Sequence, residues 1–380
     1  MTFAKKFISH VREIYETDEF IPLHEPKFIG NEKKYVTDTI DSTFVSTAGK
    51  YVEAFEQNIA EYVGAKHAIA TVNGTSALHM ALVLAGVTNG DLVITQSFTF
   101  VATCNAVRYC GADPVFVDID KLGLGMSPHA LEEYLTSQTI MKDGQCIHVE
   151  SGRRIKACVP MHTFGNPVDM DKIISICKRF SVFIVEDAAE SLGSMYKGHH
   201  TCTFGELGIL SFNGNKIITT GGGGMIITNN DELAVKAKYL TTTAKIAHKW
   251  NYVHDIVGYN YRMPNLNAAL GCAQIENLAL FVDKKRQLAD KYSSWSRENG
   301  INFFQESEMS KSNYWLNAII LDDEKERDAF LKETNDNGVM TRPSWEPMHR
   351  LSMYKECFCG SLNNTELMAA RIVNIPSSVI

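Results

Sequence analysis

The sequence lacks the features that place a protein in a membrane or in an oxidising compartment. No run of about 18 apolar residues occurs, so no transmembrane helix is predicted. The N-terminal residues contain no unbroken apolar stretch of the kind that a secretory signal requires. The nine cysteines include no CxxC pair, which argues against a disulfide framework and against a structural metal site. We therefore expect a cytoplasmic protein that binds no metal.

An excess of charge of one sign is also missing. The 37 Lys and Arg residues and the 44 Asp and Glu residues give a formal net charge of −7. A mildly acidic chain has no overall field that would attract nucleic acid or an anionic membrane, so we expect neither as a partner. Any anionic ligand must then be held by a local arrangement of donors. The composition, 45% apolar and 21% charged, is that of a globular protein.

Short apolar runs alternate with helical patterns through the first two thirds of the chain. The runs are apolar on consecutive residues, as in strands that are buried on both faces. Strands that alternate with helices of about 10–15 residues indicate βαβ units. The sequence therefore predicts an α/β fold whose large domain has a mostly parallel, seven-stranded sheet flanked by helices. The predicted strands are residues 67–72, 92–95, 114–119, 155–161, 182–185, 207–212 and 225–228.

The pattern changes near residue 263. A long helical stretch is predicted over 265–299, followed by a strand at 314–321, a helix at 324–334 and a short strand at 339–341. This succession indicates a smaller α+β domain that is tethered by the long helix. We divide the chain into an N-terminal helical extension (1–24), a large domain (25–260) and a small C-terminal domain (261–380).

Ligands of open parallel sheets bind at the carboxyl ends of the strands, so the residues that follow the strands are the candidates for chemistry. Residues 73–76, with the sequence NGTS, follow the first strand and open a helix. Small residues let a phosphate approach the backbone, and the N–H groups of the first helical turn point towards it. The alternative interpretation is an ordinary helix-capping turn.

Two more candidates follow later strands. Asp187 comes after 182–185 and could pair with a protonated ring nitrogen, although it could also be a helix cap. Lys216 lies in a turn after 207–212 and could form a Schiff base, although most lysines are solvated surface charges. A phosphate cradle, a ring-nitrogen carboxylate and a lysine together are the groups that pyridoxal phosphate (PLP) requires.

Four motifs resemble those of the DegT-like nucleotide-sugar aminotransferases, which have the aspartate aminotransferase fold, fold type I. They are NGTSALH (73–79), EDAAESLG (186–193), SFNGNKIITTGGGG (211–224) and GYNYRMPNLNAALG (258–271). The resemblance runs from about Phe28 to the end of the chain. Within the family, the sequence is most similar to the aminotransferases of legionaminic acid biosynthesis, for example in EFIPLHEPKFIGNEKKYV and SNYWLNAIIL.

The resemblance implies a role for each residue that matches a family motif. Lys216 would form the Schiff base with PLP and move the proton, and Asp187 would pair with the pyridine nitrogen. Phe100 would stack on the ring. Glu190, where the family often has Gln or His, would lie near the phenolic oxygen. The implied phosphate ligands are Gly74, Thr75, Ser76 and Ser211, with Asn260 supplied by the neighbouring subunit of a homodimer that shares its active sites.

The implied reaction moves the amino group of L-glutamate onto a nucleotide-linked keto sugar. The implied acceptor is UDP-2-acetamido-4-keto-2,6-dideoxyhexose, whose 4-amino product would feed surface polysaccharide or nonulosonic acid synthesis. His162 follows a strand and could face the sugar, or could be a hydrogen-bonded structural histidine. The segment 241–254 could contact the nucleotide, or could be a solvated loop at the dimer edge. The other candidate substrate contacts are Lys245, His248, Lys249, Trp315 and Arg342.

Other functions stay open at this point. The acceptor could be a 3-keto UDP-sugar or a GDP-4-keto-6-deoxy sugar, because the cofactor residues do not distinguish these substrates. A nicotinamide-dependent sugar oxidoreductase would also have a parallel sheet, but the sequence has no GxGxxG after its first predicted strand. A non-catalytic sensor with the same fold would have no need of both Lys216 and Asp187.

Overall fold

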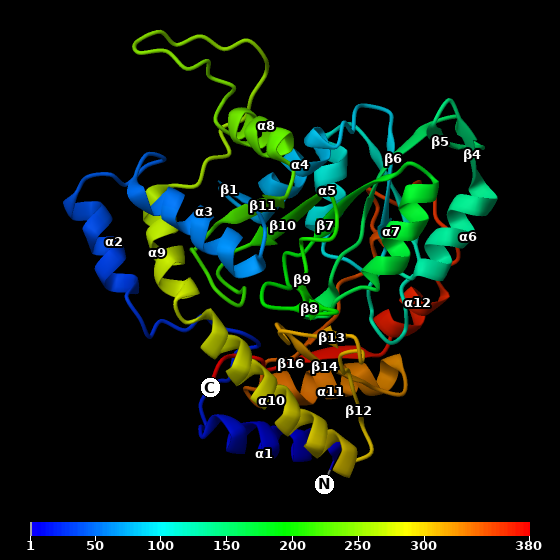
Figure 1. The fold of residues 1–380 in the computed structure, drawn as a ribbon. Coiled ribbons are helices and arrows are strands. Elements are labelled where there is room, and N and C mark those ends of the chain that lie inside the picture. Colours follow the sequence, from blue (N-terminus) through cyan, green and yellow to red (C-terminus); the bar gives the residue numbers. More distant parts are fainter. Residues whose placement is uncertain (1) are drawn as a thin grey trace.

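A large sheet runs through the centre of the molecule in the computed structural model, which describes residues 2–380 (Figure 1). Seven of its nine strands lie in the order β1 (His67–Thr71), β11 (Gly224–Thr228), β10 (Leu207–Ser211), β7 (Phe183–Asp187), β6 (Arg154–Val159), β2 (Leu92–Gln96) and β3 (Asp113–Val117). The strands from β10 to β3 are parallel, and β11 is antiparallel to β1 and β10. The predicted α/β fold with a mostly parallel seven-stranded sheet is confirmed.

The other two strands of this sheet form a hairpin that the sequence analysis missed. The hairpin consists of β4 (Thr139–Lys142) and β5 (Gln145–His148), and β5 is antiparallel to β6. Half of the residues in its two strands are exposed, and no continuous apolar run marks it. Its turn is Asp143–Gly144, with φ of 51° and 74°. An Asp-Gly pair is itself a hairpin signal and could have revealed these strands.

Helices cover both faces of the sheet because consecutive strand residues point to opposite sides (Figure 1). Val93 and Val185 belong to the buried cluster on one face, and Ile94 and Ile184 belong to the cluster on the other. The first cluster includes α4 (Gly74–Leu84), α5 (Val101–Tyr109) and α8 (Asp231–Thr241). The second includes α6 (Pro128–Gln138) and α7 (Met170–Arg179), while α3 (Lys50–Val63) packs beside β1.

The C-terminal part forms a second, smaller sheet with the order β12 (Asn302–Phe303), β14 (Asn317–Ile320), β16 (Ile372–Ile375) and β15 (Arg342–Pro343). The helix α11 (Glu324–Asp336) agrees with the prediction. The helix predicted over 265–299 is two helices, α9 (Asn265–Ile275) and α10 (Leu278–Glu298), because Asn277 has non-helical dihedral angles. The last strand, β16, was not predicted.

The N-terminal helix α1 (Phe3–Tyr15) belongs to the core of this smaller unit. Phe7 and Val11 are buried in one cluster with Tyr292 of α10 and Phe330 of α11. The following segment continues the contact, since Ile21 N donates to Gly338 O at 2.8 Å. The division at residues 24 and 260 stays a prediction, but the contacts place residues 3–21 on the C-terminal elements.

The remaining elements join these parts. α2 (Glu32–Asp41) packs on α9, and β13 (Ser310–Lys311) pairs with β8 (Met195–Tyr196), which pairs with β9 (His199–His200). α12 (Asn363–Ala369) is tied to the large sheet, because the Thr365 hydroxyl donates to Asp118 at 2.8 Å. Over residues 2–380, no helix has the combination of length and apolar character that crossing a membrane requires.

Replacing Phe7 with Ala should destabilise the protein, because the side chain is 1% exposed and fills the core between α1, α10 and α11. A Phe→Ala change in a core costs about 3–5 kcal/mol of unfolding free energy. Chemical unfolding followed by circular dichroism would measure it, with Lys6→Ala on the exposed face of α1 as the control. Equal unfolding curves for Phe7→Ala and the unmodified protein would contradict the packing described above.

Candidate active site

The C-terminal ends of β1 and β10 lie at the same edge of the sheet, with the single strand β11 between them. Thr71 and Ser211 are both in register with Gly224. A Cβ atom on Gly224 would lie 2.4 Å from Asn73 O, and a Cβ atom on Gly74 would lie 2.8 Å from Ser211 Cβ. Glycine at both positions therefore allows the turn after β1 to pass directly over the end of β10.

This close approach brings the predicted phosphate ligands together. Asn73 begins α4 by accepting a hydrogen bond from Ser76 N at 2.8 Å. Gly74, Thr75 and Ser76 form the first turn of this 11-residue helix, and Ser211 lies against it. The N-terminus of a helix presents backbone N–H groups and a positive dipole end, which suit a phosphate. The cradle therefore fits the phosphate of PLP.

Asp187 ends β7 and is buried, with 4% of its surface exposed. Its carboxylate accepts hydrogen bonds from the Thr103 hydroxyl at 2.7 Å and from Ala189 N at 3.2 Å. Burial nevertheless raises its pKa. A buried carboxylate of this kind is stabilised by a cationic partner, as a protonated ring nitrogen would be. Thr103, on α5, had no signal in the sequence.

Lys216 is not a solvated surface charge, since its side chain is 12% exposed. Its Nζ atom lies 3.6 Å from Glu190 Oε1 and 4.1 Å from the ring centroid of Trp315. The indole N–H of Trp315 donates to Asn215 O at 2.7 Å, which fixes the ring beneath the lysine. Trp315 was predicted as a substrate contact, and here it forms the floor under the amine through a cation–π contact.

Glu190 is the second buried carboxylate of the site, and it is 4% exposed. Its Oε2 atom accepts a hydrogen bond from Phe164 N at 2.9 Å, and its backbone carbonyl accepts one from the Asn313 amide at 2.9 Å. Burial raises the pKa of Glu190 to about 7, although the charge of Lys216 opposes this shift. The carboxyl group therefore titrates near neutral pH.

Phe100 lies at the N-terminal end of α5, in the segment that follows β2, and 49% of its surface is exposed. Its ring meets the edge of Trp345 with the centroids 6.4 Å apart. Trp345 in turn packs on Phe98 and Phe164. The exposed ring leaves room for a stacked partner, and its stacking role stays a prediction.

His162 corrects one of the substrate predictions, because its side chain is fully buried. Its Nε2 atom lies 3.1 Å from Glu186 Oε2, and its Nδ1 atom accepts a hydrogen bond from Val168 N at 3.1 Å. Glu186 also accepts from the backbone N–H of Cys202 at 2.9 Å. Both ring nitrogens are engaged within the protein, so His162 is the structural histidine of the two alternatives and does not face a sugar.

The segment that carries Lys245, His248 and Lys249 extends from α8 as a long loop that projects away from the rest of the chain (Figure 1). Lys245 Nζ lies 3.9 Å from the ring centroid of Tyr252, and His248 accepts the backbone N–H of Asn251 at 2.9 Å. These three side chains are exposed. Nothing in the described chain brings them to Lys216.

Asn260 and Arg342 are likewise exposed and are not brought to Lys216. The side-chain oxygen of Asn260 accepts a hydrogen bond from Arg262 Nε at 3.1 Å. Arg342 lies on β15 and donates to Asn335 Oδ1 at 2.9 Å. A role for either residue in this site would require a neighbouring subunit or a different side-chain position.

His24 is a residue near the site that sequence reasoning missed. Both of its ring nitrogens are buried, and within residues 2–380 neither has a hydrogen-bond partner. Burial and the charges of Lys285 and Lys216 lower its pKa. Its neighbours hold it against the chain end, since Ser377 N donates to Leu23 O at 2.7 Å. A histidine outside the βαβ pattern carries no signal in a single sequence.

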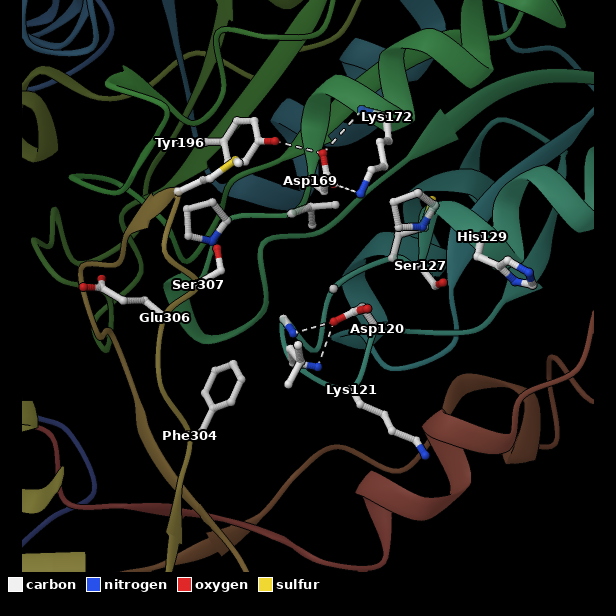
Figure 2. A pocket seen from close by; sticks show the side chains of 18 of the residues that line it. Asp120, Lys121, Ser127, His129, Asp169, Lys172, Tyr196, Phe304, Glu306 and Ser307 are labelled. Carbon is white, nitrogen blue, oxygen red and sulfur yellow. Dashed lines mark hydrogen bonds and ion pairs between the residues drawn. The ribbon is translucent and has the colours of Figure 1, made fainter. Parts of the chain in front are cut away.

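A groove of about 1240 Å³ lies elsewhere, between the helices α6 and α7 and the segment that follows β12 (Figure 2). Asp169 binds Tyr196 and Lys172 on its wall, at 2.8 Å and 2.7 Å. Asp120 accepts two backbone N–H groups of its own loop. None of the candidate cofactor residues lines this groove, so it is separate from the site around Lys216.

A lysine, a buried carboxylate and a phosphate cradle at the strand ends of this sheet define a PLP-dependent aminotransferase of fold type I. The chain belongs to the DegT/DnrJ/EryC1/StrS aminotransferase family, whose model matches residues 26–379. The fold and the site are therefore suited to the reaction of sugar aminotransferases, which transfer an amino group with PLP.

Individual relatives match along nearly the whole chain. The GDP-perosamine synthase of Escherichia coli is 36% identical over 359 residues, covering 94% of this chain and 93% of that protein. The GDP-perosamine synthase of Vibrio cholerae is 37% identical over 362 residues, with 94% of each chain covered. Among solved structures, the aminotransferase TlmJ from Streptoalloteichus hindustanus is similar with a TM-score of 0.84 and 28% identity, covering 94% of this chain and 93% of that one.

Replacing Asp187 with Asn should weaken PLP binding and lower turnover by more than ~100-fold, because removing one charge of a buried pair costs about 3–5 kcal/mol. Cofactor content after dialysis and the rate of colour loss with glutamate would measure the two effects. Asp169→Asn is the matched control, since Asp169 lies on the separate groove and Asn caps a helix as well as Asp does. Full activity of the Asp187→Asn protein would refute the pairing with the ring nitrogen.

Proposed function

We propose that this protein transfers the amino group of L-glutamate to a nucleotide-linked keto sugar at the site around Lys216. The observation that carries the proposal is the environment of Lys216, a largely buried amine between Glu190 and Trp315 with Asp187 nearby. PLP, when bound, supplies the aldehyde for a Schiff base and a ring that delocalises the electrons of the substrate carbon.

Each residue of the site then has a defined task. Lys216 accepts and returns the proton of the substrate carbon in both halves of the reaction. Asp187 holds a proton on the ring nitrogen, while the Thr103 hydroxyl orients its carboxylate. The first turn of α4 and Ser211 hold the phosphate. Trp315 excludes water beneath the amine.

We further propose a homodimer with shared active sites. The loop after α8 exposes Trp250, Tyr252 and Val257 by 73%, 81% and 84%. Large apolar side chains gathered on one projecting segment mark a surface that another protein covers. A second copy of the chain would cover it, and Asn260, Lys245 and the other basic residues of the loop would then reach the partner's phosphate-bearing ligands.

For the acceptor, we propose UDP-2-acetamido-4-keto-2,6-dideoxyhexose, which would become its 4-amino product for surface polysaccharide or nonulosonic acid synthesis. The resemblance of the N-terminal motif EFIPLHEPKFIGNEKKYV to the legionaminic acid subgroup supports this choice. A GDP-4-keto-6-deoxy sugar is the second candidate, because two relatives at 36% and 37% identity are GDP-perosamine synthases. We place the reaction in the cytoplasm, since all nine cysteines are free, as in a reducing compartment.

An acceptor screen tests the proposal. UDP- and GDP-linked 3-keto and 4-keto sugars are offered with glutamate, and mass spectrometry detects the amino product. We expect the UDP-linked 4-keto sugar to be aminated fastest, and Lys216→Ala to abolish the product because the amine is lost.

The exposed Lys311 offers a matched control, and Lys311→Ala should keep full activity. Faster amination of the GDP-linked sugar would replace the proposed acceptor with the second candidate. If a yellow, folded protein aminated none of the sugars, nucleotide-sugar amination itself would be disproved.

A further inference from the structure

Glu190 has few partners for a buried carboxylate. Phe164 N donates to its Oε2 atom at 2.9 Å, and Lys216 Nζ lies 3.6 Å from its Oε1 atom. The other charged group that acts on it is the carboxylate of Asp187, which disfavours a second negative charge. Within residues 2–380, Lys216 is thus the only cation that balances Glu190.

The bond between Lys216 and PLP that the proposed function requires would remove part of this charge balance. When the Lys216 ammonium condenses with an aldehyde, a C=N bond forms and the aldehyde oxygen leaves as water with two of the three ammonium protons. The nitrogen keeps the third proton or releases it to solvent. An amine that could direct three N–H donors towards Glu190 then has at most one. An ionised Glu190 would keep only the Phe164 N–H as a certain donor.

A buried carboxylate whose cationic partner loses N–H donors, or also loses its charge, binds a proton more readily, because desolvation penalises the charged form more than the neutral one. Asp187 does not take up a proton in this way, because Thr103 and Ala189 both donate hydrogen bonds to it and a protonated ring nitrogen would add a cation. The two carboxyl groups are thereby driven towards opposite charge states. This contrast depends on the contacts of each group and on the proposed function.

We propose that Glu190 takes up a proton when Lys216 becomes bound to PLP, so that the loaded site contains a neutral glutamic acid next to an ionised Asp187. The neutral group donates a hydrogen bond where an ionised carboxylate only accepts. Glu190 acts in this way through Lys216, because it places an O–H donor beside that side chain and stores a proton within its reach. The burial that brings its pKa to about 7 even beside Lys216 makes this uptake easy at neutral pH.

Proton counting tests the proposal. PLP is added to the cofactor-free protein in a weakly buffered dye solution, about one pH unit above the pKa of Glu190. The unmodified protein should take up close to ~1 proton per site more than Glu190→Gln, which has nothing to titrate there. Glu206→Gln changes a carboxylate that accepts Ile184 N outside the site, and it should behave as the unmodified protein does.

Infrared difference spectra give a second readout that does not depend on any variant. The unmodified protein should gain the C=O band of a protonated carboxylic acid on binding PLP, and labelling its glutamate with carbon-13 should shift that band. Absence of the band, or equal proton counts for the unmodified protein and Glu190→Gln, would overturn the proposal. Failure of the unmodified protein to turn yellow would instead refute the proposed function, so the two failures are distinguishable.

Discussion

The parallel pairing of β7 with β10 is the constraint on which the site depends. In this pairing Ile209 lies opposite Asp187, so both strands end at the same edge of the sheet. The chain leaves β10 through Ser211 and reaches Lys216 within five residues, which keeps the amine near the carboxylate. The turn after β1 arrives at the same edge because β1 runs parallel to β10 across their common neighbour β11.

The electrostatics of the site follow from the unequal hydrogen bonding of two similar groups. Asp187 and Glu190 are both carboxylic acids at the same strand end, and both are 4% exposed. Their difference lies in the donors around them, a hydroxyl and a backbone N–H for Asp187 against one backbone N–H for Glu190. Two neighbouring acids can therefore serve different purposes without any difference in burial.

Sequence reasoning identified the parts that local patterns encode. The apolar runs located all seven strands of the main path, and the residues after β1, β7 and β10 pointed to Gly74, Asp187 and Lys216. It did not find contacts that only packing creates. Thr103 is an ordinary threonine in a helix, and only the folded chain shows that Trp315 packs under Lys216 while His162 is buried against Glu186. No local pattern marks the break between helices at Asn277, and the hairpin β4–β5 has no continuous apolar run.

The N-terminal segment shows that the range matched by a family model and a folding unit are different things. The family model begins at residue 26, yet α1 fills the hydrophobic space between α10 and α11, and Ile21 pairs with Val339. A truncation at the start of the family match would retain every catalytic motif. It would also expose the apolar side chains of α10 and α11 that α1 covers, and it would remove His24, whose pKa is lowered partly by the charge of Lys216.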